Sequence, residues 1–235
     1  MTRLLIISYD VIDTRMAGPG ARYWEMANAL ARVVDVTLAA PDGAPAVEGL
    51  TTYGYRRTDW DTLAPAIARA DVLLLDGYLL THFPQVATCG KPLVIEATYP
   101  YGFETLQQFS DESQVQQMAG FRSKLEITRR VAEAGDFFFS ATERQRDYWL
   151  GVLDALGRIN PVTYASDATL HQLIDVVPFG LPSRPPEYHG PVIKGVIPGI
   201  APGDRVILWG GGLWQWLDPL SLVRAVARLA QTRDE

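Results

Sequence analysis

The sequence RLLIISYDVIDTRMAGPGARYWEMANALARVVDVTLAA occupies residues 3–40 and contains two apolar runs of strand length separated by a helical pattern. The runs, at 3–8 and 34–40, are continuously apolar, which is typical of parallel strands covered on both faces. Between them, residues 21–33 carry apolar side chains at helical spacing: Tyr23, Ala27 and Leu30. The stretch therefore predicts a strand–helix–strand unit of a parallel sheet.

The same alternation continues along the chain. Further runs with strand character are TTYGY (51–55), DVLLLD (71–76), PLVIEA (92–97), DFFFSA (136–141) and IDVVPFG (174–180). Helical patterns lie between them, at 58–70, in two segments joined near Gly120, and at 141–156 behind a capping-box pattern from Ser140 to Glu143. Repeated alternation predicts an α/β fold with a Rossmann-like, doubly wound parallel sheet.

Composition limits the classes of function. The 235 residues include 48% apolar and 20% charged residues, which is enough to form a sizeable core. A formal charge of -6 argues against a nucleic-acid partner. The single cysteine, Cys89, excludes a disulfide framework and a cysteine-rich metal site, and favours a cytoplasmic location. No window of about 20 apolar residues predicts a membrane span, although peripheral contact with the inner face of a membrane stays open.

A change in composition divides the chain. Residues 181–204 contain six prolines and four glycines, which predicts a linker behind a first domain at 1–180. An apolar run, RVILWGG (205–211), and a helix at 219–231 follow, with Asp218 as N-cap and Pro219 at the first helical position. One strand and one helix cannot bury their own apolar faces, so we expect 205–235 to begin a truncated second domain. The alternative is that the pair packs on the first domain.

Two glycine clusters precede helical patterns. Gly18 and Gly20 stand where free N–H groups and the helix dipole favour an anion, although glycines that serve only the geometry of the connection are an open alternative. A dinucleotide-binding turn would need a third glycine and a shorter loop after the first strand, so the sequence argues against NAD. Gly210, Gly211 and Gly212 follow an apolar run, which predicts close approach of a ligand. Trp214 and Trp216 beside them are candidates for stacking on a sugar or a base, or for the core.

Four segments, in this order, resemble the amino-terminal part of a family 4 type glycosyltransferase with the GT-B fold. They are DTRMAGPGARYWEMANALA, SATERQRDYWLGVL, IDVVPFGLP and RVILWGGGLWQWLDPLSLVRAVARLA. The resemblance covers essentially the whole chain. It implies two Rossmann-like domains facing each other across a cleft, the first on the acceptor side and the second binding a nucleotide-diphosphate-sugar donor.

The resemblance also implies roles for the glycines. Gly18 to Gly20 would line the cleft near the donor phosphates, and the backbone of Gly210 to Gly212 would meet the diphosphate. Such enzymes usually need no metal and no further cofactor, and transfer is expected to retain the anomeric configuration. The carboxylate pair that grips the donor lies beyond residue 235, so we expect residues 1–235 alone to be inactive without the missing donor domain.

The remaining candidates each have a structural alternative. The resemblance places His82 near the transferred sugar, whereas a loop histidine is more often structural. Glu96 and Tyr99 end a strand at the edge where α/β sheets bind ligands, so they are candidates for acceptor contact. Arg22 is a candidate for a phosphate contact, or a solvated arginine. Three further cleft candidates follow the sixth strand: Ser140, Glu143 and Arg144. Helix capping is the alternative explanation for Ser140 and Glu143. The basic residues of 121–134 are a weak membrane signal, with a solvated face as the alternative.

The sequence therefore predicts an enzyme that transfers a sugar from a nucleotide-diphosphate-sugar to a saccharide, lipid-linked or small-molecule hydroxyl. Two other classes stay open. One is a non-catalytic Rossmann-like module that binds a ligand or partner. The other is a different nucleotide-dependent α/β enzyme, such as an epimerase or dehydrogenase. No set of residues with metal-ligand spacing is present, and no general base can be named.

Overall fold

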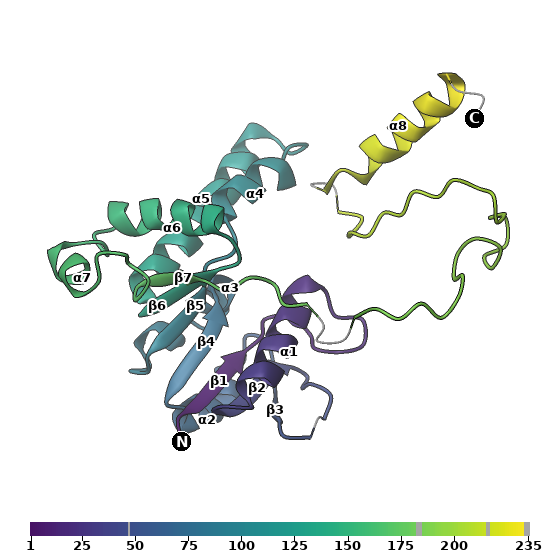
Figure 1. Ribbon diagram of the computed structural model, residues 1–235. Helices are drawn as coiled ribbons and strands as arrows, with labels where there is room; N and C mark the ends of the chain where they lie inside the picture. Colours follow the sequence, from purple (N-terminus) through teal and green to yellow (C-terminus); the bar gives the residue numbers. More distant parts are fainter. Residues whose placement is uncertain (47, 182–184, 215–216, 233–235) are drawn as a thin grey trace. The chain divides into compact units, whose positions relative to one another are not determined.

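The computed structural model describes residues 1–46, 48–181, 185–214 and 217–232 (Figure 1). Two compact units make up the chain, Met1–Gly180 and Leu181–Glu235. Each unit is described by itself. The second unit starts at Leu181, which is also the first residue of the predicted linker (181–204). Residues 182–184 of this linker lie outside the described residues.

The first unit contains a parallel sheet of seven strands, in the spatial order β3-β2-β1-β4-β5-β6-β7 (Figure 1). The strands are β1 (Arg3–Ile7), β2 (Asp35–Pro41), β3 (Thr51–Tyr55), β4 (Val72–Asp76), β5 (Leu93–Glu96), β6 (Phe137–Ser140) and β7 (Ile174–Val176). Every neighbouring pair is parallel. The order reverses between β1 and β4, which is the topological switch point where such sheets bind ligands beyond the carboxyl ends of their strands. The predicted Rossmann-like α/β fold is confirmed.

Helices cover both faces of the sheet. They are α1 (Gly18–Leu30), α2 (Trp60–Arg69), α3 (Gly77–His82), α4 (Tyr101–Gln108), α5 (Gln114–Ala134), α6 (Glu143–Ala155) and α7 (Pro161–Ser166), with a 3₁₀ turn, η1 (Pro84–Thr88). The buried side chains Tyr23 and Ala27 of α1 pack with Ile6 and Leu74 on one face. On the other face, α2, α3, α5 and α6 pack against the strand side chains that alternate along the chain with Ile6 and Leu74.

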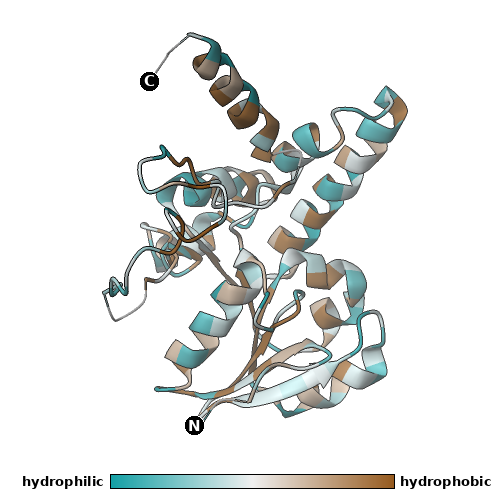
Figure 2. Cartoon of the chain, turned by 90° about the vertical axis from the view of Figure 1, so that its right-hand side faces the viewer, coloured by the Kyte–Doolittle hydropathy of each residue, from teal (hydrophilic) through white to brown (hydrophobic). Residues whose placement is uncertain are grey.

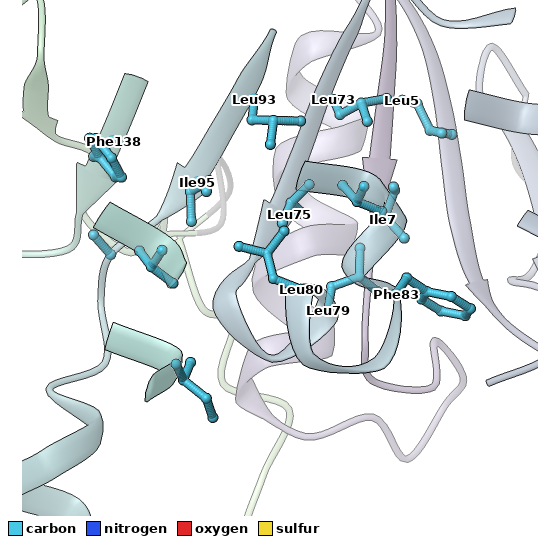
Figure 3. Packing of buried hydrophobic residues seen from close by; sticks show 14 of the residues in the cluster. Leu5, Ile7, Leu73, Leu75, Leu79, Leu80, Phe83, Leu93, Ile95 and Phe138 are labelled. Carbon is cyan, nitrogen blue, oxygen red and sulfur yellow. The ribbon is translucent and has the colours of Figure 1, made fainter. Parts of the chain in front are cut away.

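The larger core cluster fills the face opposite α1. Figure 3 shows Leu5 and Ile7 of β1 beside Leu73 and Leu75 of β4, with Leu79 and Leu80 of α3 over them. Burial of these aliphatic side chains is the main favourable contribution to folding, at about 25 cal/mol per Å² of apolar surface removed from water. The core therefore fixes the strand ends from which the candidate site is built.

Two local expectations need correction. The segment from Gly102 to Gly135 forms two helices, but they are joined at residues 109–113, and Gly120 lies inside α5. A Cβ at Gly120 would come within 3.0 Å of the Phe109 ring, so this glycine makes room for the ring. The N-cap of α6 is Thr142, which accepts a hydrogen bond from the Gln145 N–H, because Ser140 still belongs to β6.

The second unit contains α8 (Pro219–Thr232). The predicted N-cap is confirmed, since the Asp218 carboxylate accepts from the Ser221 N–H at 3.2 Å. Residues 205–211, predicted as a strand, form none in the structure, because no other strand among the described residues of this unit is present to pair with them. Apolar residues along α8 are exposed (Figure 2): Leu220, Val223, Val226 and Leu229. In the described part of the chain no helix is long and apolar enough to cross a membrane.

Candidate functional site at the carboxyl edge of the sheet

Polar side chains end several strands on the α1 face of the sheet. Ser8 follows β1, Asp76 ends β4 and Glu96 ends β5, and all three are buried. Asp76 and Glu96 are register partners in neighbouring strands. Buried carboxyl groups are expensive unless they are paired or hydrogen-bonded, so their partners show what each one does.

Glu96 is paired with Arg22 of α1. The Arg22 Nε donates to Glu96 Oε1 at 2.6 Å, and the two side chains are only 3% and 1% exposed. Glu96 Oε1 also accepts from the Thr98 hydroxyl at 2.9 Å. A second guanidinium nitrogen donates to the carbonyl of Val177 at 2.6 Å, and the guanidinium lies 4.4 Å from the centroid of the Phe179 ring. Arg22 therefore joins α1 to the ends of β5 and β7, and its guanidinium is not open to a phosphate in this arrangement.

Asp76 connects β4 to α3. Its carboxylate accepts from the Leu79 N–H at 3.1 Å and so caps the helix. Burial raises the pKa of Asp76 to about 7, the backbone hydrogen bond from Leu79 opposes this rise, and the nearby Glu96 adds to it. At neutral pH this carboxyl group is therefore close to half ionised.

Tyr23 lies against the same row. Its hydroxyl is fully buried and finds no hydrogen-bond partner in the described part of the chain. Burial and the nearby carboxyl groups of Glu96 and Asp76 raise the pKa of Tyr23 well above its ordinary value. The phenol therefore stays protonated, with a free donor next to two carboxyl groups.

Three rings meet across the topological switch point, and we call them the ring cluster: Tyr9, Tyr78 and His82. Tyr9 follows β1, and the other two belong to α3, which follows β4. The Tyr9 and His82 rings are 4.8 Å apart, and the Tyr9 hydroxyl is 3.4 Å from His82 Nε2. The Tyr78 ring is stacked 6.1 Å from Tyr9. His82 Nδ1 contacts the Tyr78 carbonyl at 2.9 Å, which fixes the orientation of the imidazole.

Two cations flank the ring cluster. Arg57, which follows β3, donates to the Tyr9 carbonyl at 2.9 Å and lies 4.9 Å from the centroid of its ring. Lys124 of α5 donates to the Tyr78 hydroxyl at 3.0 Å, with its ammonium 4.5 Å from the ring centroid. Burial lowers the pKa of Lys124, and Glu104 opposes that effect. The edge of the sheet therefore presents aromatic faces between two positive charges.

The two glycines of the first cluster differ in environment. A Cβ at Gly20 would lie 3.0 Å from the Val11 carbonyl and 3.2 Å from Met16 Cβ, so close packing requires this glycine. At Gly18 no atom lies within 4 Å of the Cβ position. The helix begins at Gly18 without a side-chain cap and without an acidic residue in its first turn. Its free N–H groups therefore stand where an anion would be favourable.

A cavity of about 370 Å³ lies beside this helix start. Its lining comes from the loop after β1 and from Arg57: Asp10, Val11, Asp13, Arg15, Met16, Ala17 and Arg57. Arg57 therefore belongs both to the cavity wall and to the surroundings of the ring cluster. Burial raises the pKa of Asp10, and Arg57 lowers it. Positive charge from Arg15, Arg57 and the helix dipole faces two carboxyl groups, so the cavity is polar with both signs of charge.

The other predicted residues lie outside this arrangement or at its border. Tyr99 is half-buried, with its ring 6.1 Å from Tyr101. Ser140 is buried and donates to the Thr142 carbonyl, while Glu143 and Arg144 are exposed at the start of α6. Gly210, Gly211 and Gly212 belong to the second unit, where the Trp209 indole donates to the Gly212 carbonyl at 3.1 Å. Trp216 lies outside the described residues.

Sequence reasoning identified only His82 among the residues of the ring cluster and its cations. Tyr9 and Tyr78 each come one or two residues after a predicted strand, at the ligand-binding edge, and that position is the signal that could have found them. Lys124 lies in the middle of a long helix, and nothing in its sequence neighbourhood indicates that it reaches Tyr78. Within the described residues, no group of three or more His, Cys, Asp or Glu side chains is placed to hold a metal ion.

No family model and no curated protein matches the chain. Among solved structures, similarity is found to a UGT transferase from Siraitia grosvenorii in complex with UDP, with 17% identity and a TM-score of 0.41 over 77% of this chain and 48% of that one. Phytolacca americana UGT2 complexed with UDP-2fluoro-glucose and pterostilbene gives 12% identity and a TM-score of 0.41, over 83% and 54% of the two chains.

Medicago truncatula UGT71G1 complexed with UDP-glucose gives 12% identity and a TM-score of 0.40, over 76% of this chain and 51% of that one. The chain thus spans about half the length of these solved structures. At such identities and TM-scores the similarities carry no argument about function.

Proposed function

We propose that the chain is the acceptor-side portion, with the start of the donor side, of a glycosyltransferase that uses a nucleotide-diphosphate-sugar. The observation that carries the proposal is the open start of α1 beside a polar cavity that is lined by the loop after β1 and by Arg57. The order of motifs that resembles a family 4 type glycosyltransferase supports it independently. Transfer to a hydroxyl acceptor, with retention of configuration and without a metal, follows from that resemblance.

The chemistry requires stabilisation of a leaving diphosphate. Free N–H groups at the start of α1, with the helix dipole, supply positive potential there, and the open space at Gly18 allows close approach of a phosphate. In the second unit, the backbone at Gly210 to Gly212 is proposed to contact a donor phosphate. Fixed dipoles of this kind stabilise developing charge without a metal ion.

His82 is proposed to contact the transferred sugar. Its ring is held by the Tyr78 carbonyl through Nδ1 and lies beside Tyr9. With Nδ1 bonded to that carbonyl, Nε2 is the acceptor nitrogen, and a sugar hydroxyl is proposed to replace the Tyr9 hydroxyl that lies 3.4 Å from it. No general base is assigned, since in retaining transfer the leaving phosphate is able to take the proton of the acceptor.

The test uses the protein expressed from the whole reading frame. Sequencing past codon 235 establishes where that frame ends. The protein is incubated with UDP-, GDP- and ADP-sugars and a panel of hydroxyl acceptors, and release of nucleoside diphosphate is measured. We expect turnover with one donor class, unchanged in excess EDTA, and a product that keeps the donor's anomeric configuration by NMR. His82→Ala should lower turnover at least about tenfold.

His171→Ala is the matched control, because His171 is exposed and paired with Asp175, away from the ring cluster. Absence of turnover with every donor class, together with NAD binding or with no nucleotide binding at all, would overturn the proposal. NAD binding would favour a dehydrogenase or epimerase, and no nucleotide binding would favour a non-catalytic module.

A further inference from the structure

The two cations at the ring cluster differ in their contacts from the ion-paired cations of the first unit. Exposed Arg3, Arg56 and Arg129 pair with carboxylates, and so does buried Arg22. The contacts that the structure gives Arg57 and Lys124 are instead with tyrosine oxygens and tyrosine rings. Within the described residues, neither forms an ion pair within 4.0 Å. Two positive charges therefore stand at the ligand-binding edge without a directly bonded carboxylate.

Lys124 is the more constrained of the two. Its side chain is half-buried between α5 and α3, and its ammonium has one hydrogen-bond acceptor, the Tyr78 hydroxyl. An ammonium has three N–H donors, so bonding capacity remains for a ligand. Glu104, the acidic group that acts on Lys124 electrostatically, is not within ion-pair distance. An anion held here would gain a charge-assisted hydrogen bond in a partly desolvated place.

The three rings of the cluster indicate which group of the ligand lies next to its anionic group. The faces of Tyr9 and Tyr78 are stacked, and His82 is tilted against Tyr9. Tyr9 and Tyr78 are half-buried, and apolar contact with the accessible parts of their rings favours a ring-shaped ligand. Lys124 lies beside Tyr78 at one end of the cluster, and Arg57 lies beside Tyr9 at the other. A ligand that stacks on the cluster therefore has a cation within reach at either end.

We propose that this cluster binds an acceptor made of a ring that carries a carboxylate, with the ring against Tyr9 and Tyr78 and the carboxylate on Lys124. The inference rests on the proposed function and names the acceptor class of that same site. The carboxylate gives selectivity over neutral ring acceptors, and the stacked ring places a hydroxyl near His82. The shared chemistry covers aromatic acids and sugar acids alike.

Binding is measured by isothermal titration and ligand-observed NMR with two matched pairs of probes. The first pair is 4-hydroxybenzoate and 4-hydroxybenzamide, and the second is methyl glucuronoside and its amide. The members of each pair have the same ring and nearly the same shape, and the amide lacks the negative charge and carries an NH2 donor in place of one acceptor oxygen. We expect the acid of at least one pair to bind about tenfold more tightly than its amide, as a charge-assisted hydrogen bond would give.

Lys124→Met keeps the aliphatic contact with the Tyr78 ring and removes the charge. It should abolish the preference for the acid, because the acid loses a charge-assisted hydrogen bond and the amide only a neutral one, while Lys124→Arg should restore part of the preference. Lys91→Met is the matched control, since Lys91 is a half-buried lysine that donates to the Ala70 carbonyl at the opposite edge of the sheet. The control should keep the full preference.

Equal binding of acid and amide in both pairs, or an acid preference that survives Lys124→Met, would overturn the inference. The pair that shows the acid preference indicates whether the acidic ring is an aromatic acid or a sugar acid. The measurement needs no donor, so it is independent of turnover. An acid preference without sugar transfer would therefore contradict the proposed function alone, and transfer without an acid preference would contradict the inference alone.

Discussion

At the scale of single residues, the carboxyl edge of the sheet contains two buried acidic groups that bond to different partners. Glu96 is paired with the Arg22 guanidinium, while Asp76 has backbone N–H donors and no cation bonded to it in the described residues. Removal of one partner of a buried pair leaves an uncompensated charge, which is far more costly than the pair is stabilising. Loss of Arg22 should therefore lower stability by leaving Glu96 without its cation, whereas removal of the Asp76 carboxyl group should change how stability depends on pH.

Arg22→Met should lower the free energy of unfolding by about 3–5 kcal/mol, because Glu96 would keep only its bond from Thr98. Arg3→Met is the control: it breaks the Arg3–Asp71 pair, whose side chains are 54% and 39% exposed, and should cost under about 1 kcal/mol. Urea unfolding followed by tryptophan fluorescence measures both. Similar losses for the two variants would show that the buried pair has no special role.

Asp76→Asn should change how stability depends on pH. In the unfolded chain an aspartate titrates near 3.8, whereas burial raises the pKa of Asp76 to about 7 in the folded state. Between these values the unfolded state loses its proton first, so this group's contribution to stability falls as pH rises, by about 1.4 kcal/mol per pH unit. Below about pH 4 and above about pH 7 the contribution is flat.

The asparagine keeps the cap of α3 and removes the titration. The difference in free energy of unfolding, Asp76→Asn minus wild type, should therefore increase between pH 4.5 and 6.5. Asp61→Asn, at an exposed position in the first turn of α2, is the control and should give a nearly constant difference. Parallel profiles for wild type and Asp76→Asn would mean that Asp76 is ionised throughout this range.

At the scale of elements, α1 combines two functions of glycine that look the same in the sequence. Gly20 is buried under the loop that follows β1, and Gly18 opens to free space. The geometric explanation of this glycine cluster therefore applies to Gly20, and the ligand-binding explanation stays a proposal for Gly18. Only the packing of the loop on the helix separates them.

Gly20→Ala should destabilise the chain by about 1–3 kcal/mol, because the new methyl group would press on the Val11 carbonyl and on Met16. Gly18→Ala should change stability by less than about 0.5 kcal/mol, since its methyl group meets no atom and alanine suits a helix. Thermal unfolding measured by circular dichroism compares the two. A larger loss for Gly18→Ala would contradict the assignment.

At the scale of the whole molecule, the core belongs to one unit. Among the described residues, every buried apolar side chain lies at or before Ile174, and the apolar side chains along α8 are exposed or only partly buried. Hydrophobic burial is the main source of folding free energy, so stability should come from Met1–Gly180. The units Met1–Gly180 and Leu181–Glu235 should then be separable without loss of the first.

A chain ended after Gly180 should keep the melting temperature of residues 1–235 within about 3 °C. The physical reason is that the truncation removes none of the buried apolar side chains of the described residues. Circular dichroism of the two chains at equal concentration makes the comparison. A markedly lower melting temperature for the shorter chain would show that Leu181–Glu235 stabilises the first unit.

The sequence by itself determined the repeated strands and helices, the parallel sheet and the change of composition after residue 180, because apolar periodicity and turn residues are local signals. Seven predicted strands are present; each begins within one residue of its expected start and ends within four residues of its expected end. The run at 205–211 failed as a strand, since a strand needs a partner that local sequence does not supply.

Only the tertiary structure decided which side chains meet. Arg22 and Glu96 are 74 residues apart, and Tyr78 and Lys124 are 46 apart, yet each pair is in hydrogen-bond contact. Such contacts depend on the order of strands and the register between them, which fix the places of loops far apart in the chain. The elements are therefore encoded locally, whereas the ring cluster and its cations exist only once the sheet has brought its carboxyl ends together.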